Sequence, residues 1–126
     1  MAIYFIYGTL KDNMKNNHIL KECRAKFIGD VITKDKYPMF DLGDGFPYIQ
    51  DKKGIGYNIS GELYEIKDSY QKKLDWFEGV PTLYKRGKIE VEGNIGCSTT
   101  ADCYFIVDEL DIDELNRVNF LNEWID

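Results

Sequence analysis

The sequence predicts an α+β domain: a small, mixed but mostly antiparallel β-barrel or strongly curled sheet with flanking helices. Apolar, β-favouring runs separated by turn residues recur along most of the chain, whereas only three stretches have the spacing or caps of a helix. The expected order is β, short α, several β, α, β, β, α, with at most one helical crossover. Periodicity leaves the choice between a closed barrel and an open sheet undecided.

A single domain covering residues 1–126 is expected, because a chain of this length can bury roughly two-thirds of the surface that its unfolded form exposes. Hydrophobic residues make up 44% and charged residues 30%, the balance of a globular protein and not of a disordered one. The sequence has no internal repeat and no linker rich in Pro, Gly or Ser that would divide domains.

The first strand and the first helix are predicted close to the amino terminus. Residues 2–7 are apolar and β-favouring, and Gly8 ends the run. Asn13 or Asn16 then caps a short helix that continues to about Lys21.

The middle of the chain is predicted to consist mainly of strands. Residues 25–35 should form one strand, and residues 37–50, which hold two of the three prolines, should form loops and short strand pieces. Residues 56–66 should form another strand, which Gly61 kinks or bulges.

The second helix is predicted to follow Asp68, whose side chain can accept hydrogen bonds from the free amides of the first turn. Gly79 and Pro81 should end it, because glycine tolerates a left-handed cap and proline cannot continue a helix. One apolar face follows the i, i+4, i+7 spacing of a helix: Tyr70, Leu74 and Phe77.

The last part of the chain should add two strands and a third helix. The strands are expected at about residues 84–92 and 101–107, and the helix over residues 111–125, with acids in its first turn where the helix dipole favours them. Three residues of this helix should face inward: Leu115, Val118 and Leu121.

The charge balance excludes some classes of protein. Sixteen Lys and Arg against 22 Asp and Glu give a net charge of -6, which argues against nucleic-acid binding, since that needs a basic face. The best local basic patch, Lys85, Arg86 and Lys88, falls on a predicted strand, where a solvated sheet edge is the simpler interpretation. The longest apolar run is too short for a membrane span, and no signal peptide is evident at the start. We therefore expect a cytoplasmic protein without nucleic-acid or membrane partners.

The cysteines and the single histidine leave little room for metal or imidazole chemistry. Cys23, Cys97 and Cys103 are widely spaced and form no CxxC pair, so reduced thiols are expected and no metal site is predicted. His18 is the only histidine, and no nucleophile motif accompanies it; its simplest interpretation is a residue on the short helix. An enzyme built from this sequence would therefore use a carboxylate as its proton carrier.

Three segments could carry chemistry, and the first is the turn of Tyr7, Gly8, Thr9 and Leu10 directly after the first strand. Gly8 lets the backbone approach a ligand and adopt unusual dihedrals. Amide hydrogens in such a turn have no partners in a sheet and can bind a carboxylate. A plain connecting turn is the alternative.

The second segment ends the second helix at Glu78, directly after Trp76 and Phe77. A carboxylate between these aromatic rings and the end of a helix dipole would be partly desolvated, which raises its proton affinity and suits a general base. The alternative is a solvated Glu at a helix end. The third segment, residues 81–86, contains Tyr84, which is either a substrate contact or an aromatic lid on the core.

These segments, with further short motifs in the same order, resemble the γ-glutamylcyclotransferase-like superfamily, most closely the γ-glutamylamine cyclotransferases. The resemblance runs from about residue 3 to residue 91. Its most specific part is the turn Tyr7 to Leu10 combined with Leu74-Asp75-x-x-Glu78. The other matching residues are Lys11, Asn17-His18 with Leu20, Tyr37-Pro38, Gly61-Glu62-Leu63-Tyr64 and Tyr84-x-Arg86.

The resemblance implies a compact β-barrel with flanking helices and no metal or organic cofactor. It implies that Tyr7, Gly8, Thr9 and Leu10 form the substrate-binding loop and that Glu78 is the catalytic acid/base. The expected partner is a small-molecule γ-glutamyl substrate, and the expected assembly is a monomer or weak dimer.

The function predicted from these implications is conversion of a γ-glutamyl amine to 5-oxoproline and free amine, by attack of the substrate's own α-amino group. Two alternatives within the enzyme class are a cyclotransferase that unblocks a γ-glutamyl group during biosynthesis and one that acts on γ-glutamyl amino acids. Outside it, the alternatives are a non-catalytic small-molecule-binding module of the same fold and an interaction domain that uses exposed aromatic residues.

Overall fold

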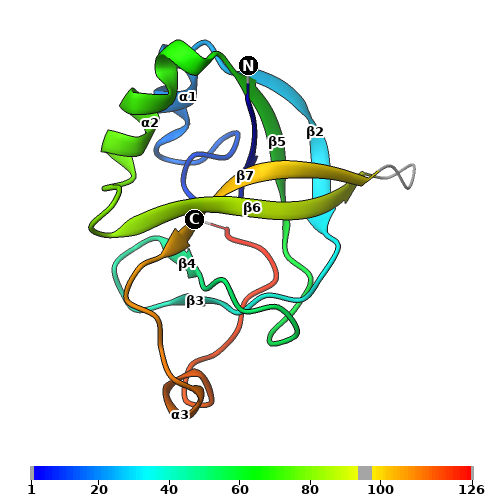
Figure 1. Ribbon diagram of the computed structural model, residues 1–126, viewed down its shortest axis with the longest axis vertical. Helices are drawn as coiled ribbons and strands as arrows, with labels where there is room; N and C mark the ends of the chain where they lie inside the picture. Colours follow the sequence, from blue (N-terminus) through cyan, green and yellow to red (C-terminus); the bar gives the residue numbers. More distant parts are fainter. Residues whose placement is uncertain (1, 94–97, 126) are drawn as a thin grey trace.

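The computed structural model describes residues 2–93 and 98–125 and contains a closed barrel of five strands (Figure 1). The strands follow one another around the barrel in the order β1-β5-β2-β6-β7. Four neighbouring pairs are antiparallel, and β1 and β7 close the barrel as a parallel pair. The bounds are β1 Ala2–Ile6, β2 Lys26–Thr33, β5 Ser60–Ile66, β6 Tyr84–Gly93 and β7 Ser98–Ile106. The predicted mixed, mostly antiparallel barrel is confirmed.

Strand β1 is buried on both faces, which explains its nearly continuous apolar sequence. Tyr4 and Ile6 pack into one buried cluster with residues of the helices, whereas Phe5 and Tyr7 pack into a second cluster with residues of β6 and β7. Successive side chains of a strand point to opposite faces, so a strand covered on both sides has no polar face to show. The end of this strand is therefore held firmly by the core.

Two helices lie together at one end of the molecule, and a third lies at the other end (Figure 1). Lys73 of α2 and Glu22 of α1 approach to 4.0 Å across the pair of helices. The bounds are α1 Asn17–Glu22, α2 Gln71–Phe77 and α3 Ile112–Leu115. A 3₁₀ turn, η1, covers Asp68–Tyr70, so α2 begins at Gln71 and not directly after Asp68 as predicted.

A short hairpin, β3 Met39–Asp41 with β4 Pro47–Ile49, forms a separate two-stranded sheet. This agrees with the prediction of loops and short strand pieces over residues 37–50. The hairpin brings Phe46 and Pro47 to the cavity described below. Among the described residues, no helix has the length and apolar character required to cross a bilayer.

The prediction that Gly61 kinks or bulges its strand is wrong. Gly61 pairs regularly with Val31, and the register shift between β2 and β5 lies on the opposite strand, between Phe27 and Gly29. Glycine is required at position 61 for space, because an added Cβ atom would lie 2.6 Å from the ring of Phe5. The sequence pattern alone does not distinguish a bulge from such a close approach, since glycine serves both.

The predicted C-terminal helix over residues 111–125 is also wrong in length. Only α3 is helical, and it begins with a capping box in which the side chain of Asp111 accepts a hydrogen bond from the amide of Glu114. Beyond it the chain makes long-range backbone bonds: the amide of Leu121 donates to Met39, and the carbonyl of Asn122 accepts from Ser60. These bonds take backbone groups that a continued helix would need internally.

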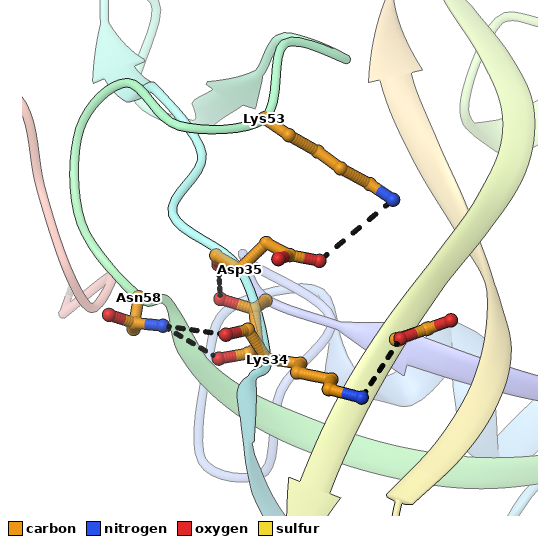
Figure 2. Close-up of polar contacts among 6 residues, drawn as sticks. Lys34, Asp35, Lys53 and Asn58 are labelled. Atoms are coloured by element: carbon orange, nitrogen blue, oxygen red, sulfur yellow. Dashed lines mark hydrogen bonds and ion pairs between the residues drawn. The ribbon is translucent and has the colours of Figure 1, made fainter.

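A polar junction fixes the point where β2 ends (Figure 2). The side-chain amide of Asn58, just before β5, donates to the carbonyls of Thr33 at 3.0 Å and Lys34 at 3.2 Å. The hydroxyl of Thr33 donates to the carbonyl of Asp35 at 2.7 Å, and the ammonium of Lys34 lies 3.6 Å from the carboxylate of Glu90 on β6. Strands β2, β5 and β6 are thereby tied together at one edge of the barrel.

Candidate active site

A cavity of about 180 Å³ brings together all six residues that the sequence singled out for chemistry. Five of them come from the turn after β1 and from the start of β6, and Glu78 follows the end of α2. This volume is below the range of about 300–1,000 Å³ that is typical of sites for drug-sized ligands, so it suits a small metabolite. The lining consists of Phe5, Ile6, Tyr7, Gly8, Thr9, Leu10, Asn16, Phe46, Pro47, Phe77, Glu78, Leu83, Tyr84 and Tyr104.

The turn after β1 presents a row of free backbone donors. The ladder between β1 and β5 ends at Ile6, and within the described part of the chain the amides of Gly8, Thr9 and Leu10 donate no hydrogen bond. The turn itself is closed by the amide of Lys11, which donates to the carbonyl of Gly8 at 3.1 Å. Consecutive unpaired amides in a fixed turn are a suitable site for an anion such as a carboxylate.

Asn16 braces this turn. Its backbone amide donates to the carbonyl of Thr9 at 2.9 Å, and its side-chain amide donates to the hydroxyl of Thr9 at 2.9 Å. The side chain was predicted as a possible cap of the first helix; it makes no capping bond there and lines the cavity instead. The short polar side chain serves either role, so the sequence gives no signal that separates them.

The unusual dihedrals predicted for Gly8 are not found, but its position is sterically restricted. It is not among the glycines with positive φ, so its backbone conformation is open to other residues. An added Cβ atom would, however, lie 3.1 Å from two ring carbons of Pro47. The hairpin and the turn therefore approach closely at this point of the cavity.

Glu78 is positioned by the end of α2. Its amide donates to the carbonyl of Leu74 at 3.0 Å, and the side chain of Leu74 is fully buried on the inner face of α2. Gly79 then adopts a φ of +70°, the left-handed conformation that ends a helix at low cost for glycine. The helix end predicted at Gly79 is thus confirmed, and the backbone bearing Glu78 is anchored in the core.

The carboxyl group of Glu78 is held in an environment that disfavours its charge. Burial raises its pKa from the ordinary 4.5 to about 8, and the nearby carboxylate of Asp75 adds to the increase. The predicted contribution of Trp76 is wrong, because that side chain is 82% exposed and lies outside the cavity lining. Phe77 does line the cavity.

Tyr84 lines the cavity and is also a buried aromatic residue of the core, as the second of its two interpretations expects. Its hydroxyl donates to the carbonyl of Pro47 at 2.9 Å, and its ring stacks on Tyr48 with centroids 5.7 Å apart. Tyr7 is likewise buried, and its hydroxyl donates to the carbonyl of Tyr104. Both phenols are therefore committed to backbone acceptors and shape the site with their rings.

Several lining residues were not predicted from the sequence: Asn16 as a lining residue, Phe46, Pro47, Leu83 and Tyr104. Tyr104 lies on β7, far from the motifs at the amino terminus, and reaches the cavity only because the barrel closes between β1 and β7. No local pattern marks such a residue, since its place depends on the pairing of distant strands.

The other candidate groups lie away from the cavity. His18 is exposed, and Cys23 and Cys103 are buried free thiols, whereas Cys97 lies outside the described residues. The basic residues Lys85, Arg86 and Lys88 each pair with a carboxylate, at 3.7, 3.1 and 2.6 Å. Over residues 2–93 and 98–125, no group of three or more His, Cys, Asp or Glu could hold a metal ion.

Comparison with known proteins gives one consistent result. The family model described as "Gamma-glutamyl cyclotransferase, AIG2-like" matches residues 4–125. A γ-glutamylaminecyclotransferase A from Danio rerio is 34% identical over 92% of this chain and 75% of that protein, and a γ-glutamylaminecyclotransferase from Rattus norvegicus is 31% identical over 82% and 76%. A crystal structure of an AIG2-like protein from Mus musculus superposes with a TM-score of 0.89 at 26% identity, covering 99% of this chain and 88% of that one.

Proposed function

Because the chain belongs to the AIG2-like γ-glutamyl cyclotransferase family, we propose that it converts a γ-glutamyl amine to 5-oxoproline and the free amine. The family membership makes the chain a cyclotransferase; the substrate and the roles of individual residues are the proposal. The observation that carries it is the shared cavity, which is lined both by Glu78 and by a turn with three free amides.

The turn is proposed to bind the α-carboxylate of the γ-glutamyl group. The amides of Gly8, Thr9 and Leu10 are free donors in the cavity lining, and Thr9 is held in place by Asn16. Fixing the carboxylate also fixes the neighbouring α-amino group. A substrate held folded in this way is close to the geometry of ring closure, which in well-oriented intramolecular reactions lowers the barrier by up to roughly 7–11 kcal/mol.

Glu78 is proposed to remove the proton that blocks the reaction. The α-amino group of the substrate is an amine beside a free carboxylate and is more basic than a peptide amino terminus, so at neutral pH most of it is ammonium and cannot attack. The pKa of Glu78, raised to about 8, lies closer to that of the amine than the pKa of an ordinary carboxyl group does, so the proton transfer costs less free energy. Such acid/base help typically accelerates a reaction by about 10²–10⁴-fold.

The proposed reaction balances without a protein nucleophile. The free α-amino nitrogen attacks the γ-carbonyl carbon, and a carbon–nitrogen bond forms that closes the five-membered lactam. The bond between that carbon and the amine nitrogen then breaks. Glu78 delivers to the departing amine the proton that it took from the ammonium. The second proton, which the ring nitrogen loses as the lactam forms, also passes to that amine, which leaves as an ammonium ion, so the enzyme returns to its starting state.

The character of the cavity favours an amine over an amino acid as the leaving group. Within the described residues, Glu78 is the only charged side chain in the lining, and Phe46, Phe77 and Leu83 supply an apolar surface. A γ-glutamyl amino acid would bring a second carboxylate with no cation to pair with it, which is costly in a desolvated site. We therefore place γ-glutamyl amino acids second.

The deciding experiment is incubation with a γ-glutamyl alkyl amide and with a γ-glutamyl amino acid, followed by mass spectrometry for 5-oxoproline. Turnover of the alkyl amide by the wild type, abolished in Glu78→Gln and retained in the surface variant Glu123→Gln, supports the proposal. Binding of the amide without release of 5-oxoproline would instead indicate a non-catalytic binding module. Equal turnover by Glu78→Gln would exclude Glu78 as the base.

The remaining expectations about the protein's setting belong to the same proposal. We propose a cytoplasmic protein that acts on a small molecule as a monomer or weak dimer and does not bind nucleic acid. The buried free thiols of Cys23 and Cys103 are compatible with a reducing compartment. Gel filtration and a filter-binding assay with nucleic acid test the last two points.

A further inference from the structure

Asp75 lies one helical turn before Glu78 and is held from two strands of the barrel. The guanidinium of Arg86 on β6 donates to both of its carboxylate oxygens, at 3.3 and 3.1 Å. The hydroxyl of Tyr104 on β7 donates to one of them at 2.7 Å. The backbone carbonyl of Asp75 also accepts a hydrogen bond from the amide of Val80 at 3.0 Å, which closes the turn that contains Glu78.

Tyr104 connects this end of the helix to the turn on the other side of the cavity. The residue lines the cavity, its hydroxyl donates to Asp75, and its backbone carbonyl accepts a hydrogen bond from the hydroxyl of Tyr7. Tyr7 directly precedes Gly8 in the turn with the free amides. One residue of β7 therefore contacts the segment that carries the base and the segment that presents the anion site.

We propose that Tyr104 and the Asp75–Arg86 ion pair are positioning residues, which hold the carboxyl group of Glu78 in register with the turn at Gly8. This inference rests on the proposed function, because it assigns a role in presenting Glu78 to the substrate. Helix α2 spans only Gln71–Phe77, so a contact to Asp75 at its last turn restrains Glu78 directly. Arg86 on β6 and Tyr104 on β7 supply that restraint. They are needed because the end of the helix lines the cavity.

The same arrangement sets the charge that Glu78 experiences. Among the described residues, Asp75 is the charged neighbour whose carboxylate acts on Glu78, and Arg86 pairs with that carboxylate. The other titratable groups that interact with Glu78 are Tyr7 after β1, Tyr84 on β6, and Cys103 and Tyr104 on β7. Burial raises the pKa of each of these four, so they remain neutral while Glu78 titrates.

The experiment compares single-charge changes at the two partners of the ion pair, Asp75 on α2 and Arg86 on β6, with one at the residue next to Arg86. Arg86→Gln should leave the carboxylate of Asp75 uncompensated and move the acid limb of kcat to higher pH by about one unit. Asp75→Asn should move it to lower pH by a similar amount, and Arg86→Lys should restore most of the wild-type position. Lys85→Gln is the matched control, because it removes the same charge from the adjacent residue, which pairs with Glu109 on the surface.

The positional part of the inference is tested with Tyr104→Phe, which keeps the aromatic ring and removes only the hydroxyl that bonds to Asp75. We expect a loss of roughly 10- to 100-fold in kcat with little change in KM, because a displaced base affects the chemical step more than binding. Unchanged kcat in Tyr104→Phe, or Arg86→Gln and Asp75→Asn shifting the limb in the same direction, would overturn the inference.

A readout independent of turnover separates this inference from the proposed function. The titration of the Glu78 carboxyl is followed by ¹³C NMR on protein labelled at the Glu side-chain carboxyl carbon, with Glu78→Gln used to assign the signal. Opposite shifts in Asp75→Asn and Arg86→Gln, with none in Lys85→Gln, support the network even if the wild type releases no 5-oxoproline. Turnover by the wild type combined with identical titrations in all variants would leave the function standing and refute the network.

Discussion

A Cβ atom added to Gly8 would lie 3.1 Å from both Cγ and Cδ of Pro47. The turn with the free amides and the β3–β4 hairpin therefore leave too little room between them for a side chain at position 8. We predict that Gly8→Val raises KM for the γ-glutamyl amine by about 10-fold or more, because the branched side chain must push the turn or the proline ring aside. The measurement is steady-state kinetics on protein whose circular dichroism matches the wild type.

Gly29→Val is the control for this change. Position 29 lies on β2, and an added Cβ atom there meets no atom within 4 Å. Its KM should match the wild type, since the substitution adds the same group away from the cavity. An unchanged KM in a correctly folded Gly8→Val protein would show that the turn does not contact the substrate.

The raised pKa of Glu78 predicts a stability difference that depends on pH. The folded state holds the proton up to about pH 8, whereas the unfolded chain loses it near 4.5, so the folded state binds more protons between these values. Stability therefore falls as pH rises through this window, and the loss is complete above the folded pKa. At about 1.4 kcal/mol per pKa unit, the full effect is roughly 3–5 kcal/mol.

Glu78→Gln removes this charge and should become increasingly more stable than the wild type from about pH 5 to pH 9. Urea unfolding at pH 5, 7 and 9 measures the difference between the two proteins, which cancels the titration of the other carboxylates. Glu123→Gln, which changes an exposed carboxylate, should show no such trend. A difference that stays constant with pH would mean that the Glu78 carboxyl is as well solvated as in the unfolded chain.

The barrel could be predicted from the sequence because its strands carry strong local signals. β1 is a run of apolar residues ended by Gly8, and α2 has both an apolar face and the terminator Gly79. The C-terminal segment could not be predicted in this way. Its apolar residues, such as Leu121, have helical spacing, but long-range backbone bonds to Met39 and Ser60 hold it in a non-helical course.

Some residues of the candidate site could likewise be predicted from local signals, and others could not. The turn at Gly8 and the carboxyl of Glu78 could be predicted because each is joined to a local structural signal, a strand end and a helix end. Tyr104 and the bracing role of Asn16 could not, since they depend on how β7 closes against β1 and how the loop folds back on Thr9. The prediction that Trp76 desolvates Glu78 is wrong. The sequence does not show in which direction a side chain at a helix end points, and Trp76 points away from the cavity.

The close approach at Gly61 predicts a large cost for a small substitution. In Gly61→Ala the new methyl group would lie 2.6 Å from the Phe5 ring and 2.7 Å from the carbonyl oxygen of Ile6, which is backbone and cannot rotate away. We expect a loss of about 1–3 kcal/mol in the free energy of unfolding, typical of overpacking. Urea denaturation measures it, with Gly29→Ala as control; a cost as small as in that control would contradict the observed packing.

Lys11 links the turn to the C-terminal segment, and its loss should affect both. The side chain is 6% exposed, and its ammonium donates to the carbonyl of Trp124 at 2.7 Å. Lys11→Met keeps the aliphatic length but leaves that buried carbonyl without its charged donor, which should reduce the free energy of unfolding by about 1.5–3 kcal/mol. KM should rise as well, because the side-chain contact to Trp124 anchors the residue whose backbone amide closes the turn at Gly8. Lys21→Met, on the exposed face of α1, removes the same charge and should change neither quantity; matching behaviour of the two variants in urea denaturation and kinetics would mean that the Lys11 contact does not hold the turn.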